Sequence, residues 1–390
     1  MSEVALRTER PKTAAEVLAL VADATEAGRR LEVIGGGTKR SIGSATGADA
    51  ILSLAKLDAV IDYAPEELVL TAQPGVKLSV LEALVAAEGQ MLPFEPPHLT
   101  GLLGSKGAAT LGGVLATNLS GPRRIRAGAA RDHFLGFEAV TGRGEAVKAG
   151  GKVVKNVTGY DLSKLVAGSW GTLAVLTEVT IKVLPAARTE LTLLFFGLDD
   201  QRASEAMTAA MNAPVELSGA AHLPPATAAR APLKGEMAVT ALRLEGFATS
   251  VAARAESLVA SLKGFGRPQE LDADHSREFW IQVREVEAFQ GDRRPLWRIS
   301  VPPASGWRVG ADLAGEALYD WAGGLVWLLS DDDPSTVRAA VRALGGHAAC
   351  YRGPAVAFEP LAGSLAALTA RVKAAFDPRG VLNPGRMGLG

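Results

Sequence analysis

Two glycine-rich stretches have the residue types that can hold an anion with main-chain groups. The first, Gly35-Gly-Gly-Thr-Lys-Arg-Ser41, follows a short apolar run. Three glycines before Thr and Lys can curl the chain so that several N–H groups converge on phosphate oxygens. The stretch has neither Walker spacing nor the Gly-x-Gly-x-x-Gly spacing of a dinucleotide fold. We expect a phosphate-binding loop here, with a plain tight turn as the alternative.

The second stretch, residues 110–132, opens like a helix start with Thr110-Leu-Gly-Gly113. Thr110 can cap the helix, the first N–H groups of a helix attract an anion, and glycine lets a ligand approach the main chain. A diphosphate would suit both stretches. After Gly121-Pro122, Arg123, Arg124 and Arg126 crowd a loop with positive charge. The alternative is an ordinary surface loop with a solvated basic cluster.

Composition narrows the classes of protein. A chain of 390 residues with 48% hydrophobic residues can bury large cores and should form two or more domains. The net charge of −1 argues against nucleic-acid binding. The single cysteine, Cys350, excludes an internal disulfide and any all-cysteine iron–sulfur or zinc site, so further electron carriers would lie in another chain. Because no run of 18 apolar residues occurs, we expect a cytoplasmic protein without a membrane segment of its own.

Local patterns predict an α+β N-terminal region. Capping boxes at Thr13–Glu16 and Ser79–Glu82 predict helices that end near Gly28 and Glu88. Apolar runs bounded by turn residues predict strands. These strands are 31–34, 50–54, 59–62, 68–72, the hairpin 134–140 with 145–148, and the long run 173–184.

Strand and helix patterns alternate in the middle region. Strands are predicted at 191–196, 215–218, 237–244, 297–301 and 325–329, and helices at 201–211 and 251–262. This order predicts βαβ halves packed as a ferredoxin-like cap. Residues 275–284 have helical spacing, and Arg284 at their end, with Arg298, could bind a substrate carboxylate bidentately. A solvated helix face and a strand-edge ion pair are the alternative.

The order of these motifs resembles the FAD-binding domain of the vanillyl-alcohol oxidase and p-cresol methylhydroxylase superfamily. The motifs are Gly35-Gly-Gly-Thr38, Gln73-Pro-Gly75, Thr110-Leu-Gly-Gly113, Asn118, Arg131-Asp132 and 171–179. Three further motifs, 119–124, 155–161 and 376–386, resemble the FAD-binding E subunit family of glycolate oxidase. The resemblance implies an FAD-binding domain at residues 1–187, an α+β cap at 188–346, and a C-terminal segment, 347–390, that returns to the FAD-binding domain.

The resemblance also implies which residues bind FAD. The two glycine stretches would grip the diphosphate from two sides, Pro74 and Gly75 would line the isoalloxazine side, Val179 would meet the adenine edge, and Asn383 would return the C-terminal segment to the flavin. Val179 could equally be a core residue, and Asp132 could simply pair with Arg131. The full predicted set is Gly35, Gly36, Gly37, Thr38, Lys39, Ser41, Pro74, Gly75, Thr110, Leu111, Gly112, Gly113, Asn118, Gly121, Asp132, Val179 and Asn383.

Two departures from the family pattern bear on chemistry. Many relatives attach the flavin through a histidine in the first loop, where this chain has Thr38, so we expect non-covalent FAD. The five histidines, at 98, 133, 222, 275 and 347, are scattered, which supports neither a metal site nor an evident general base.

Two functions remain open from the sequence. The first is oxidation of glycolate or a similar 2-hydroxy acid, in a complex with a sister FAD subunit and an iron–sulfur subunit that carries electrons onward. The second is a non-catalytic, FAD-binding accessory or relay role beside the sister subunit. In either case, any membrane association would come through the partner subunits. The arginines after Gly121 would then face a partner or the cap rather than FAD.

Overall fold

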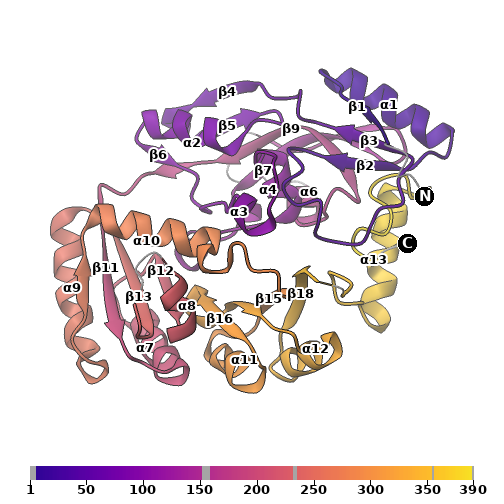
Figure 1. The fold of residues 1–390 in the computed structure, drawn as a ribbon. Coiled ribbons are helices and arrows are strands. Elements are labelled where there is room, and N and C mark those ends of the chain that lie inside the picture. Colours follow the sequence, from indigo (N-terminus) through magenta and orange to yellow (C-terminus); the bar gives the residue numbers. More distant parts are fainter. Residues whose placement is uncertain (1–5, 152–158, 232–234, 354, 389–390) are drawn as a thin grey trace.

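The computed structural model describes residues 6–151, 159–231, 235–353 and 355–388. The motif at 155–161 therefore lies largely outside the described residues. The chain folds into an N-terminal unit of three sheets and a second unit built on one large sheet (Figure 1). This mixture of helices and strands confirms the α+β fold class.

The first sheet is small and parallel, with the strand order β1-β3-β2. Helix α1 packs on it through Val17 and Val21, and the Thr13 hydroxyl accepts a hydrogen bond from Glu16 N, which confirms the predicted cap. Val381 and Leu382, from the C-terminal segment, share this core. The elements are β1 (Arg7–Glu9), α1 (Ala14–Glu26), β2 (Leu31–Ile34) and β3 (Ala50–Ser53).

The second sheet is antiparallel, with the order β4-β5-β9-β7-β8, and it shares an apolar core with helices α2, α4 and α6. Its strands are β4 (Val60–Ala64), β5 (Val69–Ala72), β7 (Phe134–Thr141), β8 (Ala146–Gly150) and β9 (Ala174–Lys182). The pair β6 (Gln90–Met91) and β10 (Leu184–Pro185) forms the third sheet. The helices of this region are α2 (Leu78–Ala87), α3 (Thr100–Leu103), α4 (Leu111–Thr117), α5 (Arg124–Ala127) and α6 (Leu162–Val166).

The start of α2 corrects one prediction. The helix follows Lys77, which makes no side-chain cap, so the Ser79–Glu82 capping box is wrong. Leu78 N instead donates to Ala109 O at 2.9 Å, beside the bridge between Lys77 and Thr110. A main-chain contact from a distant loop replaces the local cap, which the sequence pattern could not reveal.

The second unit is an eight-stranded antiparallel sheet with the order β14-β11-β13-β12-β16-β17-β15-β18. Each half follows a strand-helix-strand-strand-helix-strand path and places its fourth strand beside its first, which agrees with the expected ferredoxin-like cap. The first half contains β11 (Thr189–Phe196), α7 (Asp200–Asn212), β12 (Gly219–Leu223), β13 (Val239–Gly246), α9 (Ala248–Ser261) and β14 (Gln269–Leu271). The second half contains β15 (Leu296–Ser300), α11 (Trp307–Asp312), β16 (Glu316–Asp320), β17 (Leu325–Leu329), α12 (Pro334–Ala343) and β18 (His347–Arg352).

Two boundaries differ from the predictions in this unit. Residues 215–218 are not a strand, because Glu216 adopts a left-handed conformation (φ 50°) and β12 begins only at Gly219. The expected return to the FAD-binding domain at 347 comes later, because β18 pairs with β15 in the large sheet. The return follows Arg352 and leads through α13 (Gly363–Phe376) to the bridge between Leu31 and Leu382.

The helices divide between the two faces of the large sheet (Figure 1). Helices α7, α9, α11 and α12 lie on the face away from the N-terminal unit, whereas α10 (Ala273–Glu285) lies on the near face over the first half. The short helix α8 (Pro225–Arg230) also packs into the core on the near face. This core includes Leu99 and Leu119 of the N-terminal unit, so the two units share a buried interface.

Candidate cofactor site

A cavity with an empty volume of about 840 Å³ opens where the first loop, the start of α4, the turn before β9 and the C-terminal segment meet. The structure brings ten of the predicted residues to its wall. These are Gly35, Gly36, Gly37, Thr38, Lys39, Pro74, Thr110, Gly112, Gly113 and Asn383.

The first loop offers free donors to this cavity. Within the part of the chain that the structure describes, none of the main-chain N–H groups of residues 35–39 donates a hydrogen bond to another protein group. Gly37 has a φ of +74°, a left-handed conformation that glycine adopts without strain. Successive free N–H groups form an anion-binding nest, so this geometry suits a phosphate.

The start of α4 does not offer such donors. Leu111 N donates to Val76 O at 3.0 Å, Gly112 N to Pro74 O at 2.8 Å, and Gly113 N to the Thr110 hydroxyl at 3.4 Å. The expectation that both glycine stretches donate to one diphosphate is therefore wrong for the second stretch. The residues of the second stretch shape the wall, and the first loop supplies the N–H groups.

The glycines also serve a purpose that we did not predict. A Cβ atom on Gly112 would lie 2.5 Å from Pro74 Cβ, and Cβ atoms on Gly35 and Gly36 would overlap Thr110 and Ala108. These glycines therefore let protein segments pack against one another. Close approach of a ligand is not needed to explain them.

One cation on the wall has no carboxylate within ion-pair distance among the residues that the structure describes. Arg40 and Arg386 both pair with Glu32, at the rim of the cavity. Lys39 is buried, and its only described side-chain hydrogen bond is from Nζ to the Thr38 hydroxyl at 3.2 Å. Burial lowers the pKa of Lys39 to about 8, although Glu285 opposes this shift. An anion in the cavity would supply the missing counter-charge.

The wall includes residues that our prediction missed. Ser169 has a buried hydroxyl oxygen with no partner among the described residues, and it sits beside Trp170 on the wall. The predicted bend at 168–172, between α6 and β9, was the sequence feature that could have indicated these two residues. Asn383 has a left-handed main chain (φ 43°), accepts from Val33 N at 2.8 Å and donates to Trp170 O at 2.8 Å. It therefore ties the C-terminal segment to two parts of the wall.

Several predicted residues lie away from the wall. Val179 is fully buried in the core, at the centre of β9 between β5 and β7, so its main chain pairs within the sheet and cannot meet an adenine. Leu111 is likewise a core residue and Ser41 is exposed. Gly75 packs under Leu57, and Gly75 N donates a hydrogen bond to the carbonyl oxygen of Leu57 at 2.7 Å.

Asn118 and Asp132 hold the turn after α4. Asn118 ends the helix in a left-handed conformation, and its Oδ1 accepts from Arg131 N at 3.0 Å. Asp132 Oδ2 accepts from Ala129 N at 2.8 Å, and Oδ1 lies 3.6 Å from Arg131 Nε. Gly121 faces the cap, because its carbonyl oxygen accepts from Trp321 Nε1 at 3.0 Å.

The two carboxylate candidates have different surroundings. Arg284 donates from Nε to Glu285 Oε1 at 2.9 Å, so it is already paired. Arg298 lies over the rings of Trp321 and Trp327, at 5.1 and 5.8 Å from their centroids, with no carboxylate partner in the described residues. Arg284 is therefore paired on its own helix rather than solvated, and the strand-edge ion pair that was the alternative for Arg298 is not found among the described residues.

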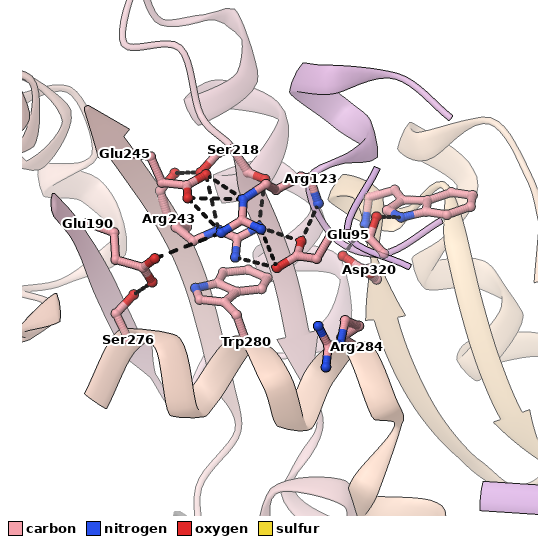
Figure 2. Close-up of polar contacts among 12 residues, drawn as sticks. Glu95, Arg123, Glu190, Ser218, Arg243, Glu245, Ser276, Trp280, Arg284 and Asp320 are labelled. Carbon is pink, nitrogen blue, oxygen red and sulfur yellow. Dashed lines mark hydrogen bonds and ion pairs between the residues drawn. The ribbon is translucent and has the colours of Figure 1, made fainter. Parts of the chain in front are cut away.

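The arginines after Gly121 face the cap, as one of our alternatives expected. Arg123 lies in a buried network with Glu95 and Glu245, in which Glu95 also pairs with Arg243 at 2.9 and 3.0 Å (Figure 2). Figure 2 shows Arg243 above the Trp280 ring of α10, 4.5 Å from its centroid. Charges from the N-terminal unit and from the first half of the cap thus neutralise one another inside the interface.

Comparison with known proteins agrees with this geometry. Residues 6–150 match the family model described as an FAD binding domain. The glycolate oxidase subunit GlcE of Escherichia coli is 38% identical over 329 residues, which cover 84% of each chain. The chain belongs to the GlcE family of glycolate oxidase subunits. This confirms the predicted family and an FAD-binding N-terminal domain.

Two further similarities place the chain more broadly. The glycolate oxidase subunit GlcD of Bacillus subtilis is 33% identical over 144 residues, 37% of this chain and 29% of that protein. The solved structure of p-cresol methylhydroxylase superposes with a TM-score of 0.70 at 15% identity, over 98% of this chain and 88% of that one. The p-cresol methylhydroxylase-type fold is thereby confirmed, and the chain is a member of an FAD-dependent oxidoreductase family. Among the described residues, no helix has the length and apolar character needed to cross a bilayer.

Proposed function

We propose that this chain is the FAD-binding subunit of a multi-subunit enzyme that oxidises glycolate or a similar 2-hydroxy acid to the 2-oxo acid. The main support is the cavity, whose first loop presents free N–H groups and a buried unpaired lysine, in a chain 38% identical to GlcE. Bound FAD would accept a hydride from the carbon that bears the substrate hydroxyl. A cytoplasmic location, with membrane contact only through partners, is part of this proposal.

The wall residues suit FAD in defined roles. The N–H groups of residues 35–39 would hold the diphosphate, with Lys39 as its counter-charge. The unpartnered Ser169 hydroxyl is available to a polar group of the cofactor. Thr38 stands where some relatives carry a linking histidine, which supports non-covalent binding. Acid precipitation should therefore release the flavin into the supernatant.

Electrons must leave through another chain in this proposal. One cysteine cannot ligate an iron–sulfur cluster that needs four, so we assign that carrier to a partner subunit, beside a sister FAD subunit. We place the FAD-binding domain at 1–187 and the cap from 188 through β18, with the C-terminal segment returning after it.

A second function is a non-catalytic accessory or relay role. The observation in its favour is that the described lining of the cavity contains no histidine. His222, for example, is buried between Thr240 and Asp200, and His133 Nε2 bonds to Ala127 O. A hydroxyl proton would then need another acceptor.

Anaerobic mixing with glycolate separates the two functions. We expect bleaching of the flavin band of this chain within the assembled complex if the chain is catalytic. A spectrum that stays unchanged while the sister subunit is reduced would contradict catalysis and support the accessory role.

The role of Lys39 has its own test. We expect Lys39→Met to weaken FAD binding roughly 10- to 100-fold, since one charge-assisted hydrogen bond is worth about 1.5–3 kcal/mol. Because the pKa of Lys39 is about 8 without an anion, FAD affinity should fall as pH rises above 8, and Lys39→Met should remove this dependence. Titration of apoprotein with FAD measures both, with the exposed Lys56→Met as control. Equal affinity in both variants would exclude Lys39.

A further inference from the structure

The near face of the second cap half is built differently from that of the first half. Helix α10 covers the first half with Phe279, Trp280 and Val283. On the second half, β15 presents Arg298 directly opposite Trp327 of β17 and Ala349 of β18. Arg298 and Ala349 remain partly exposed in the middle of the sheet, so this part of the interface is not fully packed.

A second arginine meets Arg298 from the N-terminal unit. The Arg124 guanidinium carbon lies 4.4 Å from the Trp321 ring centroid, and that of Arg298 lies 5.1 Å from the same centroid. Trp321 is held in place because its Nε1 donates to Gly121 O. One anchored indole therefore contacts two guanidinium groups, one from each unit.

Neither arginine has a carboxylate partner in the described parts of the chain, although their neighbours do. Arg123 pairs with Glu95 and Glu245, and Arg126 pairs with Glu216 at 3.0 Å. Burial, together with the positive charges of Arg298 and Arg131, lowers the pKa of Arg124, although the more distant carboxylate of Asp132 opposes this shift. A cation–π contact contributes only about 0.5–2 kcal/mol and leaves the charge in place, so the two guanidinium groups still repel each other. A bound anion would remove this repulsion.

The arginine pair lies on the same apolar cluster as the cofactor cavity. Trp170, which lines the cavity, packs against the cluster that contains Trp321 and Trp327. Its ring meets Phe358 edge-on at 5.1 Å. A small ligand held by the arginines would therefore sit at the domain interface, against the same apolar cluster that Trp170 contacts.

We propose that Arg124 and Arg298 jointly bind the carboxylate of a small organic acid across the domain interface, with Trp321 supporting both guanidinium groups. A carboxylate suits them because a guanidinium donates two parallel hydrogen bonds in a fixed fork. The inference rests on the proposed function in one respect, that the acid is the 2-hydroxy acid substrate. In this site Arg124 takes the place of Arg284, which we first proposed together with Arg298, because Arg284 already forms an ion pair with Glu285.

Calorimetric titration of the FAD-loaded chain with oxalate tests the site. Oxalate carries carboxylates but no oxidisable C–H bond, so its binding does not depend on catalysis. We expect Arg124→Met and Arg298→Met each to lower oxalate affinity at least tenfold, and Arg298→Lys to restore only part of it, because lysine keeps the charge without the fork. Arg126→Met, in the same loop but paired with exposed Glu216, is the matched control and should bind like the unmodified chain.

The outcomes separate this site from the proposed function. No oxalate binding by the unmodified chain, or equal binding by all variants with unchanged FAD content, would overturn the site. Oxalate binding that depends on both arginines, with no flavin bleaching by glycolate in the complex, would keep the site and reject catalysis. Glycolamide, which lacks the negative charge, should bind no better to the unmodified chain than to the Arg298→Met variant.

Discussion

The two halves of the cap follow the same chain path but differ in whether their charged side chains at the interface are paired. In the first half, buried Arg243 pairs with Glu95 and half-buried Glu245 pairs with Arg123 of the N-terminal unit (Figure 2). In the second half, Arg298 meets Arg124 without a carboxylate partner among the described residues. A repeated topology therefore does not repeat function. Paired charges join the units at one half, and unpaired charges are left for a ligand at the other.

Glu95 is central to the paired half. It is 7% exposed, accepts from Arg243 Nη1 and Nη2 at 3.0 and 2.9 Å, and lies 3.1 Å from Arg123 Nη1. Burial by itself would raise the pKa of Glu95, but the two arginines outweigh it and lower the pKa to about 2. The carboxylate is thus ionised at any ordinary pH, and the network is electrostatically complete only with it.

The largest expected effect comes from breaking this network. Glu95→Gln should lower the free energy of unfolding by about 3–5 kcal/mol, because buried Arg243 and partly buried Arg123 both lose a carboxylate partner and share only Glu245. Urea unfolding measures it. Glu216→Gln, which breaks the exposed pair with Arg126 in the same interface, should cost about 0–1 kcal/mol. Similar losses for the two variants would contradict the view that the first half joins the units.

A second prediction concerns the unpaired half and pH. Burial raises the pKa of Asp320 to about 7, and its Oδ1 accepts only from Trp321 N at 2.7 Å. The folded state keeps the proton that the unfolded chain releases near pH 4, so stability should fall as pH rises from 4 to 7 and then level off. Asp320→Asn should remove a change on the order of 4 kcal/mol over this interval, because the pKa differs by about three units between the two states. Unfolding at pH 4.5, 6 and 7.5 checks it, and an unaltered pH slope would argue against a buried neutral Asp320.

The smallest expected effect sharpens the comparison. Arg298→Met should change the free energy of unfolding by no more than about 0.5 kcal/mol in the absence of ligand, since it breaks no ion pair and relieves repulsion with Arg124. Urea unfolding without added carboxylate is the measurement. A loss as large as that of Glu95→Gln would show that Arg298 is structural, which would favour a packing role over a binding role.

Local sequence patterns predicted those parts of the molecule that depend on neighbouring residues. The cap of α1 at Thr13 and the loop at Gly35–Ser41 are of this kind, since turn and capping preferences act over a few positions. The failures arise from distant partners. The N–H groups at the start of α4 are bonded to Val76 and Pro74, and Val179 is enclosed by two strands. Arg284 is the exception, because its partner Glu285 is the next residue in the chain.

The site formed by Arg124 and Arg298 also could not be predicted from the sequence, because it depends on the fold. Arg124 and Arg298 are far apart in the chain, and only the anchoring of Trp321 on Gly121 brings both to one ring. The basic run 123–126 was visible in the sequence, but its three arginines have three different surroundings. One is buried in a network, one lies on an indole, and one is in an exposed pair.

The contact of Asn383 with Val33 has a consequence for biosynthesis. The two residues are 350 positions apart, and the whole cap is synthesised between them. A nascent chain that has completed both glycine loops still lacks this part of the wall. Under the proposed function, the cofactor would be held firmly only once the segment after the cap has been translated. Retention of flavin would then serve as a quality check on translation, and messages with premature stop codons in the cap would yield colourless products exposed to proteolysis.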